Sequence, residues 1–314
     1  MALFSGVSPL VTATARAAEP QVAQRRAQAP GVYRYRLGDF QVTALSDGTV
    51  PVEMHGLLQG IPRAQIDQQL ERAFLSNPVE TSITAFLIDT GSRLILVDTG
   101  VGMLFGPGVG NNLLGNLKAA GYAPEQIDDI LLTHIHADHS GGLAIEGRIL
   151  FPRATVHVGK ADVDFFLDPT HQEGVEGYDQ HYFTEAARTV GPYLKADKVR
   201  PFTGETQLFP GIKAIPTPGH TPGHSFYRVE SQGESIQFIG DIIHVAAVQF
   251  PNPAITVAFD YKPKDAAAQR VKQFAAAAKG RVLVAAPHLP FPGLGHLRAE
   301  EQGYTFVPVD YRDR

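Results

Sequence analysis

The sequence predicts one α/β domain, of the α+β kind, in which sheets are covered by helices. Three observations lead to this expectation. Short apolar strands alternate with segments of helical spacing from about residue 32 onwards. Turn residues, mostly Gly, Asp and Pro, stand at the strand ends. No Gly/Ser-rich linker, internal repeat or low-complexity tract follows residue 30, so residues 31–314 are assigned to a single domain.

Residues 1–30 differ in character from the rest. Residues 1–18 are small and apolar, and Ala15-Arg16-Ala17-Ala18 resembles a signal-peptidase site. No Lys or Arg precedes Arg16, however, and Ser, Gly and Pro interrupt the apolar stretch. We expect a weak export signal followed by a linker over residues 19–30, with a merely disordered N-terminus as the alternative. The first interpretation predicts a periplasmic or secreted protein, and the second a cytoplasmic one.

Strands are expected where apolar residues alternate or run unbroken up to a turn. In the first half of the domain these are residues 40–45, 82–88, 94–97, 127–132 and 155–158. Helical spacing covers residues 112–120, which stop at Gly121, and residues 160–167 and 184–194. The polar residues 168–182 have no clear period and are expected to form a loop or lid.

The second half continues the same alternation. Strands are expected at residues 212–215, 225–229, 236–239 and 282–285, and the tail at 304–309 is strand-like. The Ala-rich residues 265–278 predict a helix that ends at Gly280.

Composition excludes several classes of function. The chain is 44% hydrophobic and 19% charged, with a net charge of −5 and no basic run, so we expect no nucleic-acid partner. No segment approaches the roughly 20 uninterrupted apolar residues of a membrane span. The chain has no cysteine, which excludes disulfides, thiolate metal ligands and a cysteine nucleophile.

The strongest functional signal is the run Thr133-His134-Ile135-His136-Ala137-Asp138-His139. It puts four metal-ligand side chains within six residues, directly after a predicted strand. In an extended segment alternate residues point the same way, so His134 and His136 can converge on one ion. Asp138 and His139 follow in the turn and can face a second ion.

Three further candidates stand at turns after later strands. Thr217-Pro218-Gly219-His220, Ile239-Gly240-Asp241 and Ala286-Pro287-His288 each end a strand region. Loops held by strand ends are where catalytic side chains usually lie. Each alone is more typical of a hydrogen-bonded turn residue, but with the first cluster they indicate a metal centre.

The pattern His-x-His-x-Asp-His followed by these three residues resembles the metallo-β-lactamase superfamily. The resemblance implies a four-layer αβ/βα sandwich with the site at one edge of the sheets. It assigns His134, His136 and His220 to one metal, and Asp138, His139 and His288 to the other, with Asp241 bridging them. Asp98, in Val97-Asp98-Thr99-Gly100, then orients the metal-binding loop without contacting the metal itself, or serves as a turn residue.

Five imidazoles and two carboxylates suit two divalent ions, above all zinc, with manganese or cobalt as alternatives. Two ions about 3.5–4 Å apart can hold a bridging hydroxide as the nucleophile. The sequence therefore predicts a dinuclear hydrolase of ester-like bonds.

A closer resemblance, to methyl parathion hydrolase and its dihydrocoumarin-hydrolysing lactonase relatives, rests on five segments: Leu37-Gly38-Asp39-Phe40, residues 44–50, Leu104-Phe105-Gly106-Pro107, residues 246–250 and residues 288–296. It implies a homodimer acting on small, neutral aryl lactones or esters, with side activity on organophosphate triesters. It implies a substrate pocket lined by Phe105, Phe166, His244, Val257 and Phe259. His244 is expected to assist the departing oxygen, beside Asp241.

Several alternatives remain open. They are a dedicated organophosphate hydrolase, a β-lactamase, a glyoxalase-type thioesterase and a metal-binding protein without catalysis. The strand-like tail at 304–309 argues against the thioesterase, which normally has a helical C-terminal segment with basic residues. His157, His224 and His296 have no ligand position and are expected to be structural.

Overall fold

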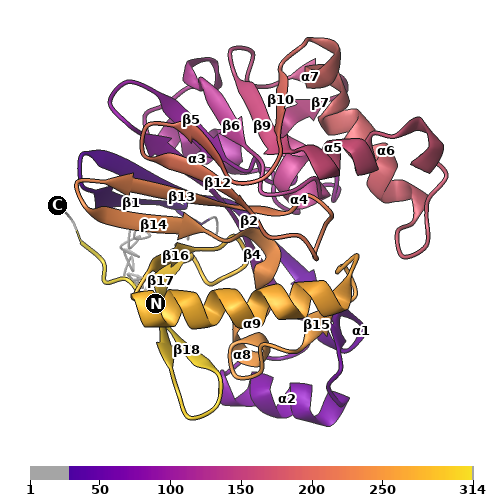
Figure 1. Ribbon diagram of the computed structural model, residues 1–314, viewed down its shortest axis with the longest axis vertical. Coiled ribbons are helices and arrows are strands. Elements are labelled where there is room, and N and C mark those ends of the chain that lie inside the picture. The colour runs from indigo at the N-terminus through magenta and orange to yellow at the C-terminus, as the bar shows by residue number, and fades with distance from the viewer. Residues whose placement is uncertain (1–27, 313–314) are drawn as a thin grey trace, which may run out of the picture.

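The computed structural model describes residues 28–312. Two seven-stranded sheets form its centre (Figure 1). The first has the order β1-β2-β4-β5-β6-β9-β10 and the second the order β11-β12-β13-β14-β16-β17-β18. The predicted export signal and most of the predicted linker lie outside the described residues.

The strands of the first sheet are β1 (Val32–Leu37), β2 (Phe40–Val52), β4 (Val79–Asp89), β5 (Leu94–Val97), β6 (Asp129–Leu131), β9 (Thr155–Gly159) and β10 (Val199–Phe202). Those of the second are β11 (Thr206–Phe209), β12 (Ile212–Pro216), β13 (Ser225–Ser231), β14 (Glu234–Phe238), β16 (Leu283–Ala285), β17 (Leu294–Ala299) and β18 (Tyr304–Pro308). Two small ribbons pair β3 (Leu58–Gln59) with β15 (Thr256–Val257), and β7 (Ala144–Ile145) with β8 (Arg148–Ile149).

The helices are α1 (Met54–Leu57), α2 (Arg63–Arg72), α3 (Leu113–Ala119), α4 (Ala137–Ser140), α5 (Lys160–Phe166), α6 (Gln180–Thr189), α7 (Gly191–Lys195), α8 (Ala246–Gln249) and α9 (Pro263–Gly280). Single 3₁₀ turns are η1 (Pro124–Gln126), η2 (Gly141–Leu143), η3 (Pro169–His171) and η4 (Gly240–Ile242). Among the described residues, no helix combines the length and apolar character that crossing a bilayer requires.

Three apolar clusters stack these elements into layers. Between the sheets, side chains such as Val42 and Ile95 of the first sheet pack against Tyr227 and Ile236 of the second. The outer face of the second sheet packs on α9 through Phe274. The predicted four-layer αβ/βα sandwich is therefore confirmed.

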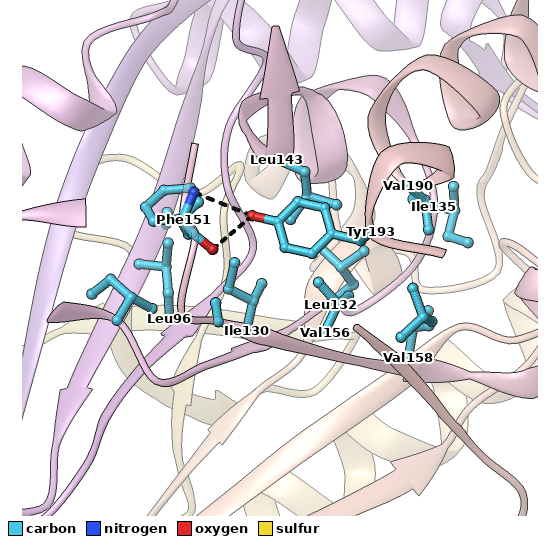
Figure 2. Close-up of a cluster of buried hydrophobic side chains, with 14 of the residues drawn as sticks. Leu96, Ile130, Leu132, Ile135, Leu143, Phe151, Val156, Val158, Val190 and Tyr193 are labelled. Carbon is cyan, nitrogen blue, oxygen red and sulfur yellow. Dashed lines mark hydrogen bonds between the residues drawn. The ribbon is translucent and has the colours of Figure 1, made fainter. Parts of the chain in front are cut away.

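The helices α3, α5, α6 and α7 cover the outer face of the first sheet (Figure 1). In this layer Tyr193 of α7 lies over the apolar side chains of the strands (Figure 2). Its hydroxyl donates to the carbonyl of Phe151 and accepts from the Phe151 amide, each at 3.2 Å. The polar end of this buried ring is thus satisfied while the ring supplies apolar area to the core.

Three expected boundaries differ from the structure. The strand predicted over 40–45 continues to Val52, because β2 absorbs the expected turn as a bulge between Ser46 and Gly48 and keeps its pairing with β4. The buried Asp47 carboxylate fixes this bulge, accepting hydrogen bonds from the amides of Val101 and Leu113, each at 2.8 Å.

The helix predicted over 184–194 is two helices, α6 and α7. The reason is Pro192 in the first turn of α7, which has no N–H and cannot continue α6. In addition, α6 starts at Gln180, inside the segment 168–182 that was expected to be a loop. Four strands of the two large sheets, β1, β10, β11 and β17, were not predicted, and neither was the helix α2.

Candidate metal centre

The seven predicted ligands come from four loops that follow strand ends. His134 and His136 lie between β6 and α4, and α4 itself carries Asp138 and His139. The others follow the second sheet: His220 after β12, Asp241 in η4 after β14, and His288 after β16. These segments lie up to 154 positions apart in the sequence, and the sandwich brings them together at one edge of the two sheets. Among the described residues, their ligand atoms form two convergent groups.

The first group contains His134, His136, His220 and Asp241. His136 Nδ1 lies 3.0 Å from His134 Nε2 and 3.1 Å from His220 Nε2. The Oδ2 atom of Asp241 lies 3.4 Å from His220 Nε2 and 3.6 Å from His134 Nε2. All four side chains are buried. Three nitrogens and one carboxylate oxygen thus face a common point.

The second group contains Asp138, His139, His288 and again Asp241. Asp138 Oδ2 lies 3.5 Å from His139 Nε2 and 3.4 Å from His288 Nε2. Asp241 Oδ1 lies 3.1 Å from His139 Nε2 and 3.2 Å from His288 Nε2. Asp241 therefore offers one carboxylate oxygen to each group, as the bridging assignment expects.

In each ligand histidine, the inner ring nitrogen faces the ligand group and the outer one faces away from it. The hydrogen bond of the outer nitrogen shows whether the inner nitrogen has a free lone pair. His139 Nδ1 donates to Asp98 Oδ2, His220 Nδ1 to Asp260 Oδ1 and His288 Nδ1 to the carbonyl of Ser82, each at 2.9 Å. Because these oxygens only accept, the nitrogens facing them carry the ring protons. The inner nitrogens then present lone pairs to one another.

Lone pairs that converge without a hydrogen between them repel unless a cation lies between them. His139 Nε2 and Asp241 Oδ1 are buried and lack a hydrogen-bond partner of acceptable geometry. Buried polar atoms without partners are costly, and a cation would satisfy both. The donor set of five imidazoles and two carboxylates therefore fits two divalent cations.

The electrostatics of His134, His136 and Asp241 agree with a ligand role. Burial lowers the pKa of His134 and of His136 well below the ordinary value, so both rings are neutral and can donate lone pairs. Burial opposes charge on Asp241 too, but the surrounding histidines, led by His139, hold the pKa of this carboxyl well below its usual range. Neutral imidazoles and ionised carboxylates are the forms that bind metal ions.

Asp98 supports the loop as well as making the turn. It has a left-handed backbone, with φ of 59°. Its carboxylate accepts from the Thr133 amide at 2.8 Å, from the Thr133 hydroxyl at 2.9 Å and from His139 Nδ1. The Thr133 oxygen is in turn 3.0 Å from His134 Nδ1. One carboxylate thereby orients ligands from both groups.

Three supporting residues were not predicted. Asp260 holds His220 and also accepts from the Val257 amide at 3.0 Å. The guanidinium of Arg270, fully buried on α9, lies 3.6 Å from Asp260 Oδ2, the oxygen that accepts from Val257. The hydroxyl of Tyr178 lies 2.9 Å from His136 Nε2. Neither Asp260 nor Tyr178 is close in sequence to the ligand that it contacts, so no motif marks them.

Among the described residues, none of the histidines expected to be structural belongs to either ligand group. His224 accepts a hydrogen bond from the Asp241 amide at 3.1 Å and lies 2.8 Å from the Thr217 hydroxyl. His157 pairs with Asp129 at 2.9 Å. His296 lies 3.2 Å from the carbonyl of Val282.

A cavity of about 510 Å³ opens over both groups. This volume is in the range of small-molecule sites. The lining residues are Val50, Pro51, Val52, Glu53, Gly56, Leu57, Thr81, Phe105, His136, Ala137, Asp138, His181, Tyr182, Glu185, Asp241, His244, Ala258, Phe259 and His288.

Three of the five predicted pocket residues line this cavity: Phe105, His244 and Phe259. Phe166 and Val257 do not, which corrects the expectation for both. Phe166 is fully buried behind His136, with ring centroids 5.8 Å apart, and belongs to the core under α6. Val257 is in the β3–β15 ribbon and packs in a separate apolar cluster.

His244 lies against the bridging carboxylate. Its Nε2 is 3.1 Å from Asp241 Oδ2, but at an angle that leaves both ring nitrogens without a hydrogen bond. The ring stacks on that of His288, with centroids 5.3 Å apart and planes at 20°. Burial lowers the pKa of His244, so the neutral ring has one N–H to offer to a bound molecule.

Comparisons with known proteins agree with this geometry. The family profile described as Metallo-beta-lactamase superfamily matches residues 79–288. An N-acyl homoserine lactonase from a Bacillus species is 23% identical over 198 residues, which are 63% of this chain and 67% of that protein. Another, from Bacillus cereus, is 22% identical over 192 residues, 61% and 64% of the two chains. The matches thus span about two thirds of these relatives.

Solved structures extend the likeness over nearly the whole chain. The crystal structure of hydrolase AbOPH in the beta lactamase superfamily has 40% sequence identity and a TM-score of 0.85, covering 91% of this chain and 100% of that one. AidC, a dizinc quorum-quenching lactonase, shares the fold at 24% identity and a TM-score of 0.80, covering 90% and 99%. With its matched profile, its sandwich and its paired ligand groups, the chain belongs to the metallo-β-lactamase superfamily.

Proposed function

We propose that the protein is a dinuclear metal-dependent hydrolase that opens lactones and aryl esters of the dihydrocoumarin type. The observation that carries the proposal is the position of Asp241. Its carboxylate reaches both ligand groups, and both groups border one cavity of substrate size. We further propose zinc as the metal and a homodimeric, exported protein.

Two divalent cations held by these groups would lower the pKa of a water molecule and polarise an ester carbonyl at neutral pH. The residues of the chain supply the rest. The outer hydrogen bonds of the ligand histidines fix the imidazole rings, so little reorganisation accompanies the reaction. His244 faces the cavity beside Asp241, where its N–H can donate to the departing oxygen.

The walls of the cavity favour an uncharged aromatic substrate. Phe105 and Phe259, each 39% exposed, supply rings for stacking and apolar burial. No Lys or Arg is among the residues that line the cavity. A β-lactam carries a carboxylate that these walls would not pair, so the cavity disfavours a β-lactamase.

The names of the relatives support the lactone part of the proposal. The Bacillus proteins are named as N-acyl homoserine lactonases, and AidC as a quorum-quenching lactonase. Activity on organophosphate triesters is proposed as a side reaction, because the same cations would polarise a phosphoryl oxygen. A dedicated organophosphate hydrolase is the second candidate.

The test is a substrate panel on zinc-reconstituted protein. We expect hydrolysis of dihydrocoumarin and of an N-acyl homoserine lactone, weaker hydrolysis of paraoxon, and none of nitrocefin. The variant His220→Ala, which removes a ligand of the first group, is the inactive control. Hydrolysis of none of the lactones or esters would refute the proposal. Faster turnover of paraoxon than of the lactones would favour the second candidate.

A further inference from the structure

A buried carboxylate outside the two ligand groups connects the loops that carry three of the ligands. Asp162 lies in the first turn of α5 and is fully buried. Its Oδ2 atom accepts hydrogen bonds from the Ile135 amide at 3.0 Å and from the Thr221 hydroxyl at 2.9 Å. Its Oδ1 atom accepts from the Gly223 amide at 2.5 Å. Both carboxylate oxygens are therefore occupied by donors of the protein itself.

These donors belong to both halves of the sandwich. Ile135 stands between the two histidine ligands of the loop that follows β6, in the first sheet. Thr221 directly follows the ligand His220, in the loop between β12 and β13 of the second sheet. The three imidazoles of the first group come from these two loops. A carboxylate that bonds to both loops therefore fixes the distance between them.

Two glycines allow the second of these loops to approach α5 closely. A Cβ atom at Gly223 would lie 2.5 Å from the Asp162 nitrogen, and one at Gly159 would lie 2.3 Å from the Gly223 carbonyl oxygen. Both contacts are too short for a real side chain, so each position has room only for glycine. The missing side chains leave the loop within hydrogen-bond reach of the carboxylate.

The Asp162 carboxyl is ionised at neutral pH. Burial raises its pKa to about 6, and the hydrogen bonds from Gly223, Ile135 and Thr221 oppose this increase. Both oxygens then act only as acceptors, and hydrogen bonds to a charged acceptor are the stronger ones. A neutral amide at this position would turn its own N–H groups towards at least one of the three donors.

The second ligand group has different supports. The outer nitrogen of His139 donates to Asp98, and that of His288 donates to the carbonyl of Ser82. The hydrogen-bond partners of the Asp162 carboxylate in the described part of the chain include none of these four residues. In addition, the loop between β12 and β13 carries a ligand of the first group only. A shift of this loop would therefore disturb one metal position and leave the other in place.

We propose that Asp162 is a positioning residue for the first metal group: it fixes the His220 loop against the loop after β6, and so determines how tightly this group binds its ion. The inference rests on the metal centre of the proposed function. It goes beyond that function by assigning separate supports to the two metal positions.

The experiment measures zinc affinity by competition with a chelator, in two backgrounds that each keep one complete group. His288→Ala keeps the first group, and His220→Ala keeps the second. We expect Asp162→Asn to lower the zinc affinity of the His288→Ala protein by about 10- to 100-fold, the usual effect of losing a group that orients the ligands. In the His220→Ala protein we expect no change.

Variants of Thr221 repeat the test without changing the carboxylate. Thr221→Val removes one of the three donors and should lower the affinity of the first group by a smaller factor. Thr221→Ser keeps the hydroxyl and should restore the affinity of the unaltered protein. In all these variants the main-chain bond from the Ser225 amide to the Thr133 carbonyl, at 2.9 Å, still holds the two loops together.

The matched control is Asp129→Asn. Asp129 is also a buried carboxylate, but it lies at the start of β6 and pairs with Arg93 at 2.7 Å and with His157 at 2.9 Å. We expect this variant to lower the temperature of thermal unfolding and to leave zinc affinity unchanged in both backgrounds. The control thus separates loss of a buried carboxylate from loss of contact with the ligand loops.

Failure of this inference can be told from failure of the proposed function. Binding of two zinc ions by the unaltered protein tests the metal centre, and hydrolysis of dihydrocoumarin tests the reaction. The inference predicts that Asp162→Asn lowers zinc affinity only where the first group is complete. Equal loss in both backgrounds, or no loss in either, would overturn it even where the unaltered protein binds two zinc ions.

Discussion

The hydroxyl of Tyr178 lies 2.9 Å from Nε2 of His136, a ligand of the first metal group. The same oxygen lies 3.1 Å from the carbonyl of His220 and 3.0 Å from that of Phe259. The phenol therefore accepts the His136 ring proton and donates to the main chain of a second ligand loop. It connects the segment before α6 with a ligand and with a wall of the cavity.

Tyr178→Phe is expected to weaken metal binding. It leaves the His136 ring proton without an acceptor and frees the ring to turn away from the metal group. Loss of such an outer hydrogen bond typically costs 10- to 100-fold in metal affinity, so we expect about tenfold or more. Zinc affinity is measured by competition with a chelator, since a purely structural role would change unfolding without changing this affinity.

The matched control for this variant is Tyr193→Phe. Tyr193 is also buried in the α7 layer and bonds main-chain atoms through its hydroxyl (Figure 2), but its partner is Phe151 and not a histidine of the metal groups. We expect it to lower stability and leave zinc affinity unchanged. Equal zinc affinity in both variants would show that Tyr178 does not orient His136.

Asp260→Ala is expected to destabilise the protein strongly. The variant leaves the fully buried Arg270 guanidinium without its carboxylate, 3.6 Å away, and His220 Nδ1 without its acceptor. Breaking a buried ion pair from one side typically costs about 3–5 kcal/mol. Denaturant unfolding of the metal-free protein measures the loss.

A second variant separates charge from packing. Adding Arg270→Met to Asp260→Ala removes the unpaired charge, so part of the lost free energy of unfolding should return. If the double variant is no more stable than the single one, the buried pair is not the cause of the destabilisation.

Removing the metal ions should lower the stability of the folded protein, and this effect can be measured without an activity assay. Without cations the inner nitrogens and carboxylate oxygens of the two groups face one another. A ligand at 100 times its Kd stabilises the folded state by about 2.7 kcal/mol. We expect a chelator to lower Tm and added zinc to restore it, in calorimetric scans at fixed protein concentration. A Tm that does not respond to chelator would argue against metal binding at these groups.

His244→Leu should lower the rate of dihydrocoumarin hydrolysis relative to that of paraoxon hydrolysis. The variant removes the ring N–H beside Asp241 and places an apolar side chain against the cavity. Loss of a donor to the departing oxygen is expected to lower kcat on dihydrocoumarin by about 10²-fold, at the low end for a positioned proton donor. The more apolar cavity wall is expected to raise paraoxon hydrolysis. Rates unchanged on both substrates would remove His244 from the reaction.

The sequence predicts which side chains converge at the candidate metal centre, because they stand at strand ends within short recognisable patterns. His134 to His139 form one continuous run, and the structure brings His220, Asp241 and His288 to the same edge. The layered fold is predicted for a similar reason, since alternating apolar strands and helices have few stable arrangements.

Residues that act at long range could not be predicted in the same way. Tyr178 is 42 positions from His136, inside a segment without period, and Asp260 is 40 positions from His220. Their roles come from folding and leave no local pattern. Phe166 shows a second limit of prediction from sequence. It was expected to line the pocket, but it lies behind His136, in the core.

The most direct test of the dinuclear hydrolase is a zinc titration of the metal-free protein, followed by the rate of dihydrocoumarin hydrolysis. If Asp241 bridges two ions, the rate should be negligible without zinc and reach its plateau at two zinc ions per chain. Full rate in the presence of excess chelator, or no hydrolysis with two zinc ions bound, would contradict the account.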